Sequence, residues 1–375
     1  MLKYKSIKNI ALVLTITALS SQGLAAKDLR MASGVPTIHP AHEPLYTLFQ
    51  EQLSLLSDGR LTTTLIGTEV TPLSGMRTGL TSGLINIGLF VPAYFPADLP
   101  EINLIGDLAF LGKNPQAMAA AMTEYVVTCD DCQAELRKLG ITYTSSLSTE
   151  AYHLLSTKPI RDLADLKGVR LRVGGPQFSR WAVAMGARPI NAPIEETFGS
   201  LSHNIIYGGV ISIADLVSLH LEDAIKYVTT INLGTYFSVI SHSVALNTWE
   251  SLSLEDRKAI AIASTVSSTQ ATNRWSKVTD QAYAVADQNK IKIIEPSEEL
   301  LAATAAFVEN DLTFAALEAG ERYKVKNAEG KIDRFRQLIN KWTEIAETVN
   351  NDATEMAKAQ QREIWDKVDF ITYGL

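Results

Sequence analysis

Short apolar segments that suit β-strands alternate with amphipathic segments that suit helices along most of this chain. Residues 29–33 and 61–66 are strand-like, and between them apolar side chains recur at i, i+3 and i+4 spacing through residues 45–56. A second helical segment at 72–82 then leads into an apolar strand at 85–90. Strand, helix and strand in this order are typical of an α/β fold with a mainly parallel sheet.

The same rhythm restarts after Gly140 and ends in a long helical region. Strand-like segments at residues 141–146, 152–156 and 169–173 form a second group, and the chain is mostly helical from Pro296 onward. A chain of 375 residues is longer than one hydrophobic core usually serves, so two domains fit. No Pro/Gly-rich linker separates them, so ordinary strands have to cross between the domains.

The N-terminus has the features of a secretory signal peptide. Three lysines precede an apolar stretch at residues 10–19, and Gly23–Ala25 supplies the small residues of a cleavage site. A membrane anchor is the alternative, but this stretch is well short of the ~20 apolar residues that span a bilayer. No cysteine stands directly after this stretch, which argues against a lipid anchor. We therefore expect an exported, periplasmic protein that is cleaved near Ala25, with residues 1–25 as the signal peptide.

The charge balance argues against several classes of partner. The chain has 34 Lys and Arg against 41 Asp and Glu, a formal charge of -7, and it has no long basic run. Nucleic acid and anionic membrane surfaces attract proteins of the opposite charge. We therefore expect no nucleic-acid partner.

Common catalytic signatures are missing from the sequence. It has no G-x-S-x-G elbow and no H-E-x-x-H pair, and Gly112–Lys113 lacks the spacing and hydroxyl residue of a phosphate loop. A secreted enzyme built on a pair of carboxylates would leave no such signature and stays an alternative. We expect a protein that is not an enzyme and that needs no cofactor or metal.

A set of motifs in a fixed order resembles one family. Asp165–Gly175 reads DLKGVRLRVGG, and residues 184–190 read AMGARPI. A strand of the form LKG-x-(K/R)-(I/L)-R, a helix and then GA-x-P resemble the substrate-binding proteins of TRAP transporters, the DctP-like family. The matches extend from Leu29 to about Tyr323. Further matches lie at residues 34–40, 158–160, 223–228 and 247–257.

This resemblance implies a periplasmic binding protein fold. Two α/β lobes then surround a central cleft and are joined by strand hinges and a long bridging helix. The expected first lobe comprises residues 26–147 and 238–275, and the second comprises residues 148–237 and 276–345. Residues 346–375 would form a C-terminal helical extension.

The resemblance also implies a role in transport. Proteins of this family capture a small carboxylate-bearing solute by closing their lobes around it. They deliver it to the small and large integral membrane subunits of a TRAP transporter. We expect this chain to do so as a monomer. A periplasmic sensor that presents its ligand to a receptor would use the same fold and stays an open alternative.

Arg172 is the leading candidate for contact with the ligand. Alternation along its strand places Leu171 and Val173 on one face and Arg172 on the other. The strand ends before Gly174, and α/β sheets bind ligands at the carboxyl ends of their strands. A guanidinium holds a carboxylate through two parallel hydrogen bonds, and the resemblance implies that Arg172 is this clamp. A surface arginine paired with an acidic residue is the alternative interpretation.

Two departures from the family pattern bear on the class of ligand. Tyr152 stands where dicarboxylate-binding and sialic-acid-binding relatives often carry a second arginine. The segment Tyr207–Ser212, which includes Ile211, replaces a polar segment that contacts the ligand in relatives. Because a second carboxylate buried against phenols would lack a partner, we expect a monocarboxylate. A zwitterionic betaine-like or sulfonium osmolyte is the narrower hypothesis, and a dicarboxylate is the alternative.

Aromatic side chains occur where the walls of the cleft are expected. They could line an apolar pocket or surround an alkylated cation, although ordinary core packing is the alternative for each. His39, before the first helix, could approach the cleft or serve its own loop. The aromatic candidates are Tyr94, Phe95, Tyr152, Trp181, Tyr207 and Tyr236.

Cys129 and Cys132 are the two cysteines of the chain. In an oxidising compartment, a short local disulfide is the expected state. Metal binding would need two more soft ligands, and redox catalysis would need a thioredoxin-like setting that the sequence does not show.

Overall fold

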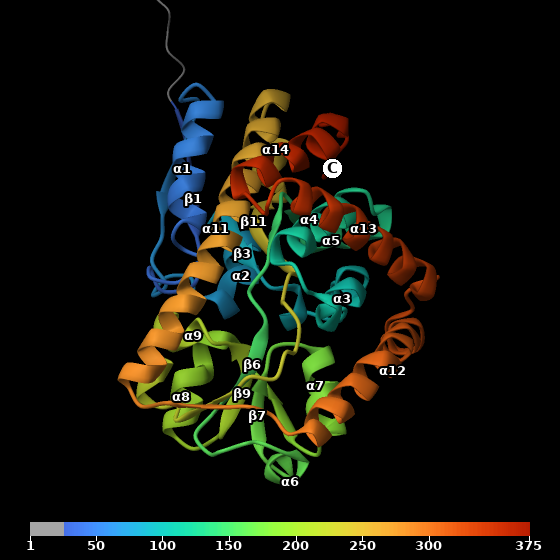
Figure 1. Ribbon diagram of the computed structural model, residues 1–375. Helices are drawn as coiled ribbons and strands as arrows, with labels where there is room; N and C mark the ends of the chain where they lie inside the picture. Colours follow the sequence, from blue (N-terminus) through green and yellow to red (C-terminus); the bar gives the residue numbers. More distant parts are fainter. Residues whose placement is uncertain (1–25) are drawn as a thin grey trace, which may run out of the picture.

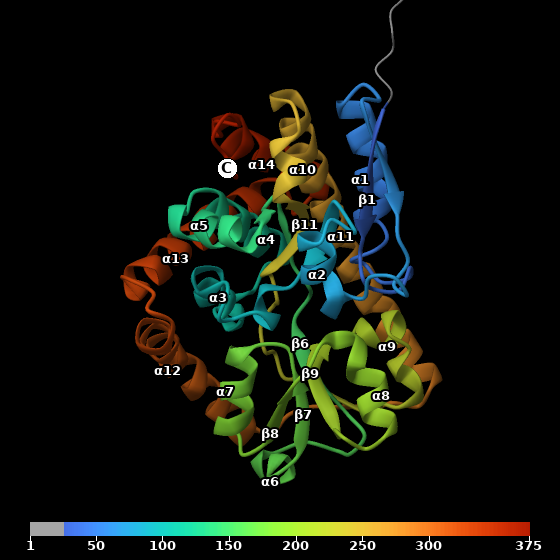
Figure 2. The ribbon, with the colours of Figure 1, turned by 180° about the vertical axis from the view of Figure 1, so that it is seen from behind.

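Two lobes, each with its own β-sheet, make up the protein (Figures 1 and 2). The computed structural model describes residues 26–375, so the expected signal peptide lies outside the described residues. Both sheets have six strands and are covered by helices. The expected two-lobed α/β fold is therefore confirmed.

The first sheet joins the N-terminal strands to a strand that returns from the second lobe. Its strands are β2 (Leu61–Leu65), β1 (Lys27–Ala32), β3 (Ile87–Phe90), β11 (Val239–Ala245), β4 (Ile141–Thr142) and β5 (Ser146–Leu147). β1 pairs in parallel with β2 and β3, whereas β11 runs antiparallel to β3, β4 and β5. Every residue of β11 is buried, so the returning strand completes the core of the first lobe.

The second sheet carries the strand that ends in the candidate clamp. Across the sheet, its strands are β12 (Lys292–Ile294), β10 (Tyr227–Thr229), β6 (Tyr152–Ser156), β9 (Gly208–Ser212), β7 (Arg170–Val173) and β8 (Arg188–Asn191). β7 runs parallel to both of its neighbours, β8 and β9. Their carboxyl ends therefore meet at one edge of the sheet, which is where such sheets bind ligands.

Helices cover both sheets and connect the lobes. In the first lobe and its connections they are α1 (Leu45–Leu56), α2 (Met76–Thr81), α3 (Pro100–Gly106), α4 (Pro115–Val127), α5 (Asp130–Leu139) and α10 (Leu246–Glu250). The second sheet is covered by α6 (Leu163–Leu166), α7 (Pro176–Ala184), α8 (Thr197–Ser202) and α9 (Asp215–Ser218). The C-terminal helices are α11 (Leu254–Gln288), α12 (Glu298–Tyr323), α13 (Ala328–Thr348) and α14 (Ala353–Glu363).

The two long helices α11 and α12 begin at serine caps. The Ser253 side chain accepts a hydrogen bond from the Asp256 backbone N–H, and Ser297 does the same for Leu300. Both helices also carry acidic residues in their first turn, which the helix dipole favours. α11 packs against α1, α9 and α14, and α12 packs against α3 and α7, so each helix touches both lobes. Figure 1 shows them on opposite sides of the molecule.

Two extended segments cross between the lobes side by side. Residues 148–151 lead from β5 to β6, and residues 230–238 lead back from β10 to β11. They pair at Ala151 and Thr235, and the Thr149 N–H donates to the Tyr236 carbonyl at 2.9 Å. Paired extended segments of this kind are the strand hinges that the sequence led us to expect.

The C-terminal helices pack differently from the expected lobe assignment. Residues 328–345, which we expected in the second lobe, belong to α13, and α13 packs on α4 of the first lobe. The physical reason is an apolar stripe that includes Phe335 and Trp342. The Phe335 ring meets the Tyr125 ring edge-on at 5.8 Å, and the Trp342 Nε1–H donates to Glu124 at 2.6 Å.

α12 is long and apolar enough to cross a membrane by length and composition alone. In the structure it packs instead along the outside of both lobes, against α3, α7 and α13. Its Thr304 hydroxyl accepts a hydrogen bond from the buried Trp181 indole at 3.1 Å. This contact makes α12 part of the folded protein.

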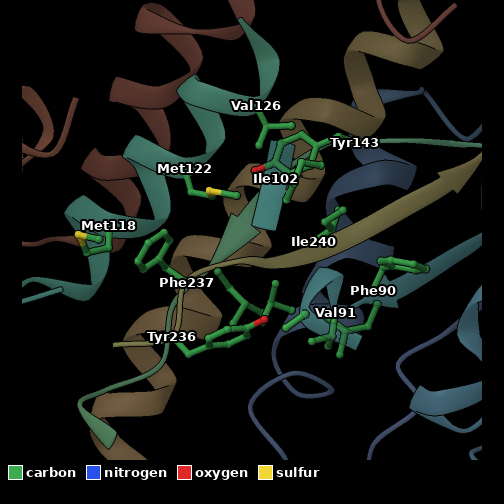
Figure 3. Packing of buried hydrophobic residues seen from close by; sticks show 14 of the residues in the cluster. Phe90, Val91, Ile102, Met118, Met122, Val126, Tyr143, Tyr236, Phe237 and Ile240 are labelled. Carbon is green, nitrogen blue, oxygen red and sulfur yellow. The ribbon is translucent and has the colours of Figure 1, made fainter. Parts of the chain in front are cut away.

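The core of the first lobe reaches the hinge segments. Figure 3 shows part of it, with Tyr236 and Phe237 pointing in different directions from the same segment. Phe237 stacks on Phe335 at 5.4 Å, whereas Tyr236 stacks on Tyr152 of the second sheet at 6.2 Å. The hinge therefore anchors one side chain in the first lobe and directs the next toward the space between the lobes.

The structure contains the expected disulfide between Cys129 and Cys132. The Cα atoms of the two residues are 5.2 Å apart, at the start of α5. Both cysteines are buried, and in the sequence they are about forty residues before Arg172.

Candidate ligand-binding site

A cavity lies between the lobes, with walls from both sheets and from α11. Its empty volume, including the space at its mouth, is about 550 Å³. A cleft between two lobes with a few convergent polar groups is a typical place for a small organic ligand. It is lined by Val35, His39, Ala41, Leu73, Leu89, Val91, Tyr94, Leu147, Thr149, Tyr152, Arg172, Gly174, Ile194, Asp215, Tyr236, Val239 and Trp275.

Arg172 enters this cavity from the carboxyl end of β7. Its side chain is held by an Nε–H donated to the Ala192 carbonyl at 2.9 Å and by an Nη2 contact of 3.5 Å with the Tyr94 hydroxyl. Arg172 is only 2% exposed, yet within residues 26–375 no carboxylate oxygen lies within 4.0 Å of its guanidinium. The structure therefore buries a positive charge without a negative partner from the described chain.

Gly174 makes room for the guanidinium. A Cβ at this position would lie 3.0 Å from Nη1 and 3.1 Å from Nη2 of Arg172. Such distances are tighter than most real Cβ contacts, so a side chain here would require the guanidinium to shift by a few tenths of an ångström. The glycine that ends the strand is thus part of what lets Arg172 reach the cavity.

Tyrosine rings form much of the wall around Arg172. Tyr152 stacks on Phe178 at 5.3 Å and on Tyr236 at 6.2 Å, which fixes both phenols at the hinge side. The Tyr94 hydroxyl accepts a hydrogen bond from the Ile194 N–H at 2.9 Å. Burial raises the pKa of Tyr152 and of Tyr94, so these phenols stay protonated and neutral.

A second polar pair lines the cavity. The Nε2 atom of His39 lies 3.8 Å from Oδ1 of Asp215, and the Ser218 hydroxyl donates to the same carboxylate oxygen at 2.9 Å. Burial lowers the pKa of His39 to about 3, with a smaller contribution from His42. Burial raises the pKa of Asp215 to about 6. At neutral pH the pair is therefore a neutral imidazole beside an ionised carboxylate.

Direct contacts between the lobes surround the cavity. Ser74 of the first lobe donates its N–H to Glu195 of the second at 2.8 Å. Tyr94 and Ile194 also come from different lobes, as do His39 and Asp215. The described arrangement is therefore one in which the lobes touch around the cavity.

Five of the expected contact residues lie on the cavity wall and four do not. Arg172, Tyr94, Tyr152, Tyr236 and His39 are brought together there. Trp181, Tyr207, Phe95 and Ile211 lie elsewhere among the described residues.

Each of these four side chains has other neighbours. Trp181 is fully buried against α12 through Thr304. The Tyr207 ring lies under Lys158 at 4.1 Å and under Arg170 at 4.7 Å, on the sheet's other end.

Phe95 stacks on Phe90 at 5.0 Å, and its ring also lies 5.5 Å from the Arg77 guanidinium carbon. Ile211 belongs to a separate apolar cluster under α8 and α9. Phe95, Ile211, Trp181 and Tyr207 are therefore not part of this cavity wall.

Asp215 and Trp275 are two of the polar or aromatic wall residues that sequence reasoning missed. Asp215 follows the carboxyl end of β9, so the argument that selected Arg172 after β7 would have found it. Trp275 lies within the long helix α11 and donates its Nε1–H to the Ser212 hydroxyl at 3.2 Å. Its ring meets the His39 ring edge-on at 5.1 Å, a contact that no local pattern in the sequence indicates.

Metal-ligating residues do not gather in the part of the chain that the structure describes. Among residues 26–375, no group of three or more His, Cys, Asp and Glu side chains is arranged to hold an ion. The cavity offers a guanidinium, phenols, an imidazole and one carboxylate. This donor set suits recognition of a polar organic molecule.

Comparison with known proteins agrees with this architecture. A curated solute-binding protein of Roseobacter denitrificans is 25% identical over 273 residues, covering 68% of this chain and 78% of the relative. The crystal structure of a TRAP periplasmic solute-binding protein from Bordetella bronchiseptica, with bound (R)- and (S)-mandelate, has a TM-score of 0.73 at 22% identity. The alignment covers 84% of this chain and 99% of the Bordetella bronchiseptica chain.

A second solved structure has the same fold. It is a TRAP solute-binding protein from Rhodoferax ferrireducens in complex with copurified benzoate, with a TM-score of 0.75 at 18% identity. The alignment covers 86% of this chain and 100% of that one. The model of the family described as bacterial extracellular solute-binding protein, family 7, matches residues 31–318. This chain therefore belongs to the family 7 bacterial extracellular solute-binding proteins, the DctP family.

Proposed function

We propose that this protein is the extracytoplasmic receptor of a TRAP transporter and that it captures a small monocarboxylate on Arg172. The observation that supports this most strongly is the buried guanidinium without a carboxylate partner in residues 26–375. A buried charge is costly unless it is paired and hydrogen-bonded. A ligand carboxylate supplies the missing partner, and a guanidinium accepts it through two parallel charge-assisted hydrogen bonds.

A single carboxylate suits the rest of the cavity better than two. Besides Arg172, the cavity wall consists of neutral phenols, apolar side chains, Thr149, Trp275, the neutral His39 ring and the Asp215 carboxylate. A second ligand carboxylate would be buried without a cation and beside a negative charge. Solved structures with the same fold hold mandelate, benzoate and pyroglutamate, each of which carries one carboxylate, and this supports the choice. The betaine-like or sulfonium hypothesis concerns the far end of the ligand and is a separate question from the carboxylate on Arg172.

Lobe closure is the mechanism of capture. Arg172 and Tyr152 belong to the second lobe, whereas Tyr94 and His39 belong to the first, so a ligand in the cavity bridges both. A ligand that touches both walls binds the closed form better than the open form, and this difference in affinity shifts the population toward closure. The closed, exported monomer would then present its ligand to the small and large membrane subunits. This role requires no covalent chemistry and no cofactor.

Isothermal titration calorimetry on a matched pair of arginine variants tests the proposal. The titrant is the monocarboxylate that most stabilises the wild-type protein in a thermal-shift screen. Arg172→Ala should weaken its binding about a hundredfold to ten-thousandfold, because a charge-assisted bidentate pair in a closed site is lost. An Arg172→Ala affinity within about threefold of wild type would contradict the proposal.

Arg170→Ala is the control for this experiment. Arg170 lies on the same face of the same strand, but its Nη2–H donates to the Asn204 carbonyl at 2.7 Å, away from the cavity. Its replacement should leave the affinity within about threefold of wild type. An equal loss in both variants would point to damage to β7 instead of a lost ligand contact.

A further inference from the structure

Two buried side chains of opposite charge line the same cavity without pairing with each other. Arg172 is 2% exposed and Asp215 is 3% exposed. Among the described residues, the only Lys, Arg or His nitrogen within 4.0 Å of the Asp215 carboxylate is Nε2 of His39. The Arg172 charge lies near enough to lower the pKa of Asp215 slightly, but the two side chains form no ion pair. The space between them is therefore flanked by a fixed cation and a fixed anion.

His39 does not neutralise Asp215. The Ala41 backbone N–H donates to Nδ1 of His39 at 3.1 Å, so the proton of the neutral ring is on Nε2. That Nε2 atom faces Asp215 but lies 3.8 Å away, which is too far for a hydrogen bond. Burial also lowers the pKa of His39 to about 3, so the ring carries no positive charge at neutral pH. At neutral pH Asp215 is ionised, and among residues 26–375 its one side-chain hydrogen-bond donor is the Ser218 hydroxyl. A backbone hydrogen bond at Ser212 also lowers its pKa.

The balance of charge in the cavity depends on what enters it. With Arg172 and Asp215 both ionised, the empty site has no net charge. A plain monocarboxylate pairs with Arg172 but adds a buried negative charge that also feels Asp215. A ligand with a carboxylate at one end and a protonated nitrogen at the other pairs with both side chains and keeps the site neutral. Buried charges are stable when each is paired and hydrogen-bonded.

We propose that Asp215, positioned beside His39, binds a protonated N–H group of the ligand whose carboxylate lies on Arg172. The site then selects small zwitterions, such as amino or imino acids, over plain monocarboxylates. An N–H group is preferred to a fully methylated ammonium because it donates a hydrogen bond to the Asp215 oxygen. This inference rests on the proposed function, since it needs Arg172 to hold the carboxylate, but it makes a separate prediction about selectivity.

Calorimetry with matched ligands is the first test. On one carbon skeleton the probes are propanoate, lactate, alanine and β-alanine, and on a second they are cyclopentanecarboxylate, proline and proline betaine. In at least one skeleton, the N–H zwitterion should bind about tenfold or more tightly than the plain acid. Tightest binding by the plain acid on both skeletons would overturn the proposal. Tighter binding of proline betaine than of proline would overturn the role given to the N–H group.

Asp215→Asn separates this proposal from a merely structural role for Asp215. The variant keeps the shape of the side chain and removes its negative charge. It should weaken the zwitterion about tenfold or more and should strengthen the matched plain acid, because the repulsion between two buried anions disappears. Equal weakening of both ligands would overturn the proposal. Arg172→Ala should weaken the binding of both ligands if Arg172 holds the carboxylate. The Arg172 and Asp215 variants therefore test the proposed function and the present inference separately.

The pH dependence of binding gives an independent readout. The groups that face Asp215 are His39, Arg172, Tyr152 and Ser218. Arg172 stays charged, Tyr152 stays neutral because burial raises its pKa, and His39 stays neutral because its pKa is about 3. On the protein side, the change between pH 7.5 and pH 5.5 is therefore protonation of Asp215, whose pKa is about 6. A plain carboxylic acid itself takes up a proton at about pH 4–5, so the affinities are compared per ionised ligand. On that basis the zwitterion should bind more weakly at pH 5.5 than at pH 7.5, and the plain acid should bind more tightly. The same direction for both would overturn the proposal.

The ligand that copurifies with the protein provides the last test. The exported protein is purified without added ligand, denatured, and its small molecules are analysed by mass spectrometry. The released compound should carry one carboxylate and one protonatable nitrogen. A compound with a carboxylate and no such nitrogen would overturn the proposal while leaving the role of Arg172 intact.

Discussion

Replacing Arg180 by glutamine should destabilise the protein strongly, because this arginine holds three carboxylates from separate parts of the fold. Arg180 on α7 binds Asp311 of α12 through two hydrogen bonds of 2.6 and 3.0 Å. Its Nη1 atom also lies 2.9 Å from Asp107 of the first lobe and 3.2 Å from Glu318 of α12. Asp107 and Arg180 come from different lobes, so the cluster also joins the lobes beside the cavity.

The size of the effect follows from burial. The Arg180 side chain is 16% exposed, and the Asp311 side chain is 5% exposed. Removing one partner of a buried ion pair typically costs about 3–5 kcal/mol, because the remaining charge stays buried and unpaired. Here three carboxylates would remain close together. Burial already raises the pKa of Asp107 to about 6 with Arg180 present. The loss should therefore be smaller at pH 5, where Asp107 can be neutral.

Arg322→Gln is a matched control on the same acidic residue. Arg322 contacts Glu318 at 3.1 Å, as Arg180 does at 3.2 Å, but its side chain is 67% exposed. An exposed i, i+4 pair contributes about 0.3–0.5 kcal/mol. Urea titrations at pH 7.5 should show a loss in the free energy of unfolding of about 3–5 kcal/mol for Arg180→Gln and less than about 1 kcal/mol for Arg322→Gln. Similar losses in both variants would refute the reasoning.

Two further predictions concern other parts of the first lobe. Thiol labelling of the exported protein, unfolded without reductant, should modify neither Cys129 nor Cys132, because they are joined; labelling of both would contradict the disulfide. Burial lowers the pKa of His242 to about 3, and its ring stacks on Phe49 at 4.2 Å. The unfolded chain binds a proton below about pH 6.5 that the fold excludes, so stability falls as the pH drops, by about 2 kcal/mol from this residue at pH 5. His242→Leu should lose less stability than wild type between pH 7.5 and pH 5 in urea titrations, and an equal loss would refute the role of His242.

Local patterns in the sequence were sufficient to predict the strand and the glycine turn that position Arg172. Alternation along residues 169–173 and the glycine that follows them placed the arginine at the carboxyl end of a strand, and the structure puts it there. The same argument applies to Asp215, which follows the carboxyl end of β9. Both positions follow from where a strand ends and from which face the side chain is on. Short-range periodicity in the sequence indicates both.

Contacts between distant segments explain what the sequence did not reveal. Trp181 lies on the helix after Arg172, but α12 covers that face and accepts its indole hydrogen bond through Thr304. Trp275 reaches the cavity because α11 runs past both lobes, so its position depends on the packing of a whole helix. α13 returns to the first lobe for the same kind of reason, since its apolar stripe finds α4. Periodicity shows that a helix has a buried face but does not show which element will cover it.

A crystal structure of the protein with its copurified ligand tests the central claim most directly. We expect the ligand in the cavity between the lobes, with both oxygens of a carboxylate about 2.7–2.9 Å from the guanidinium nitrogens of Arg172. Tyr94 and Tyr152 should contact the same molecule from opposite lobes. A ligand bound elsewhere, or bound in this cavity with no anionic group on Arg172, would contradict the claim.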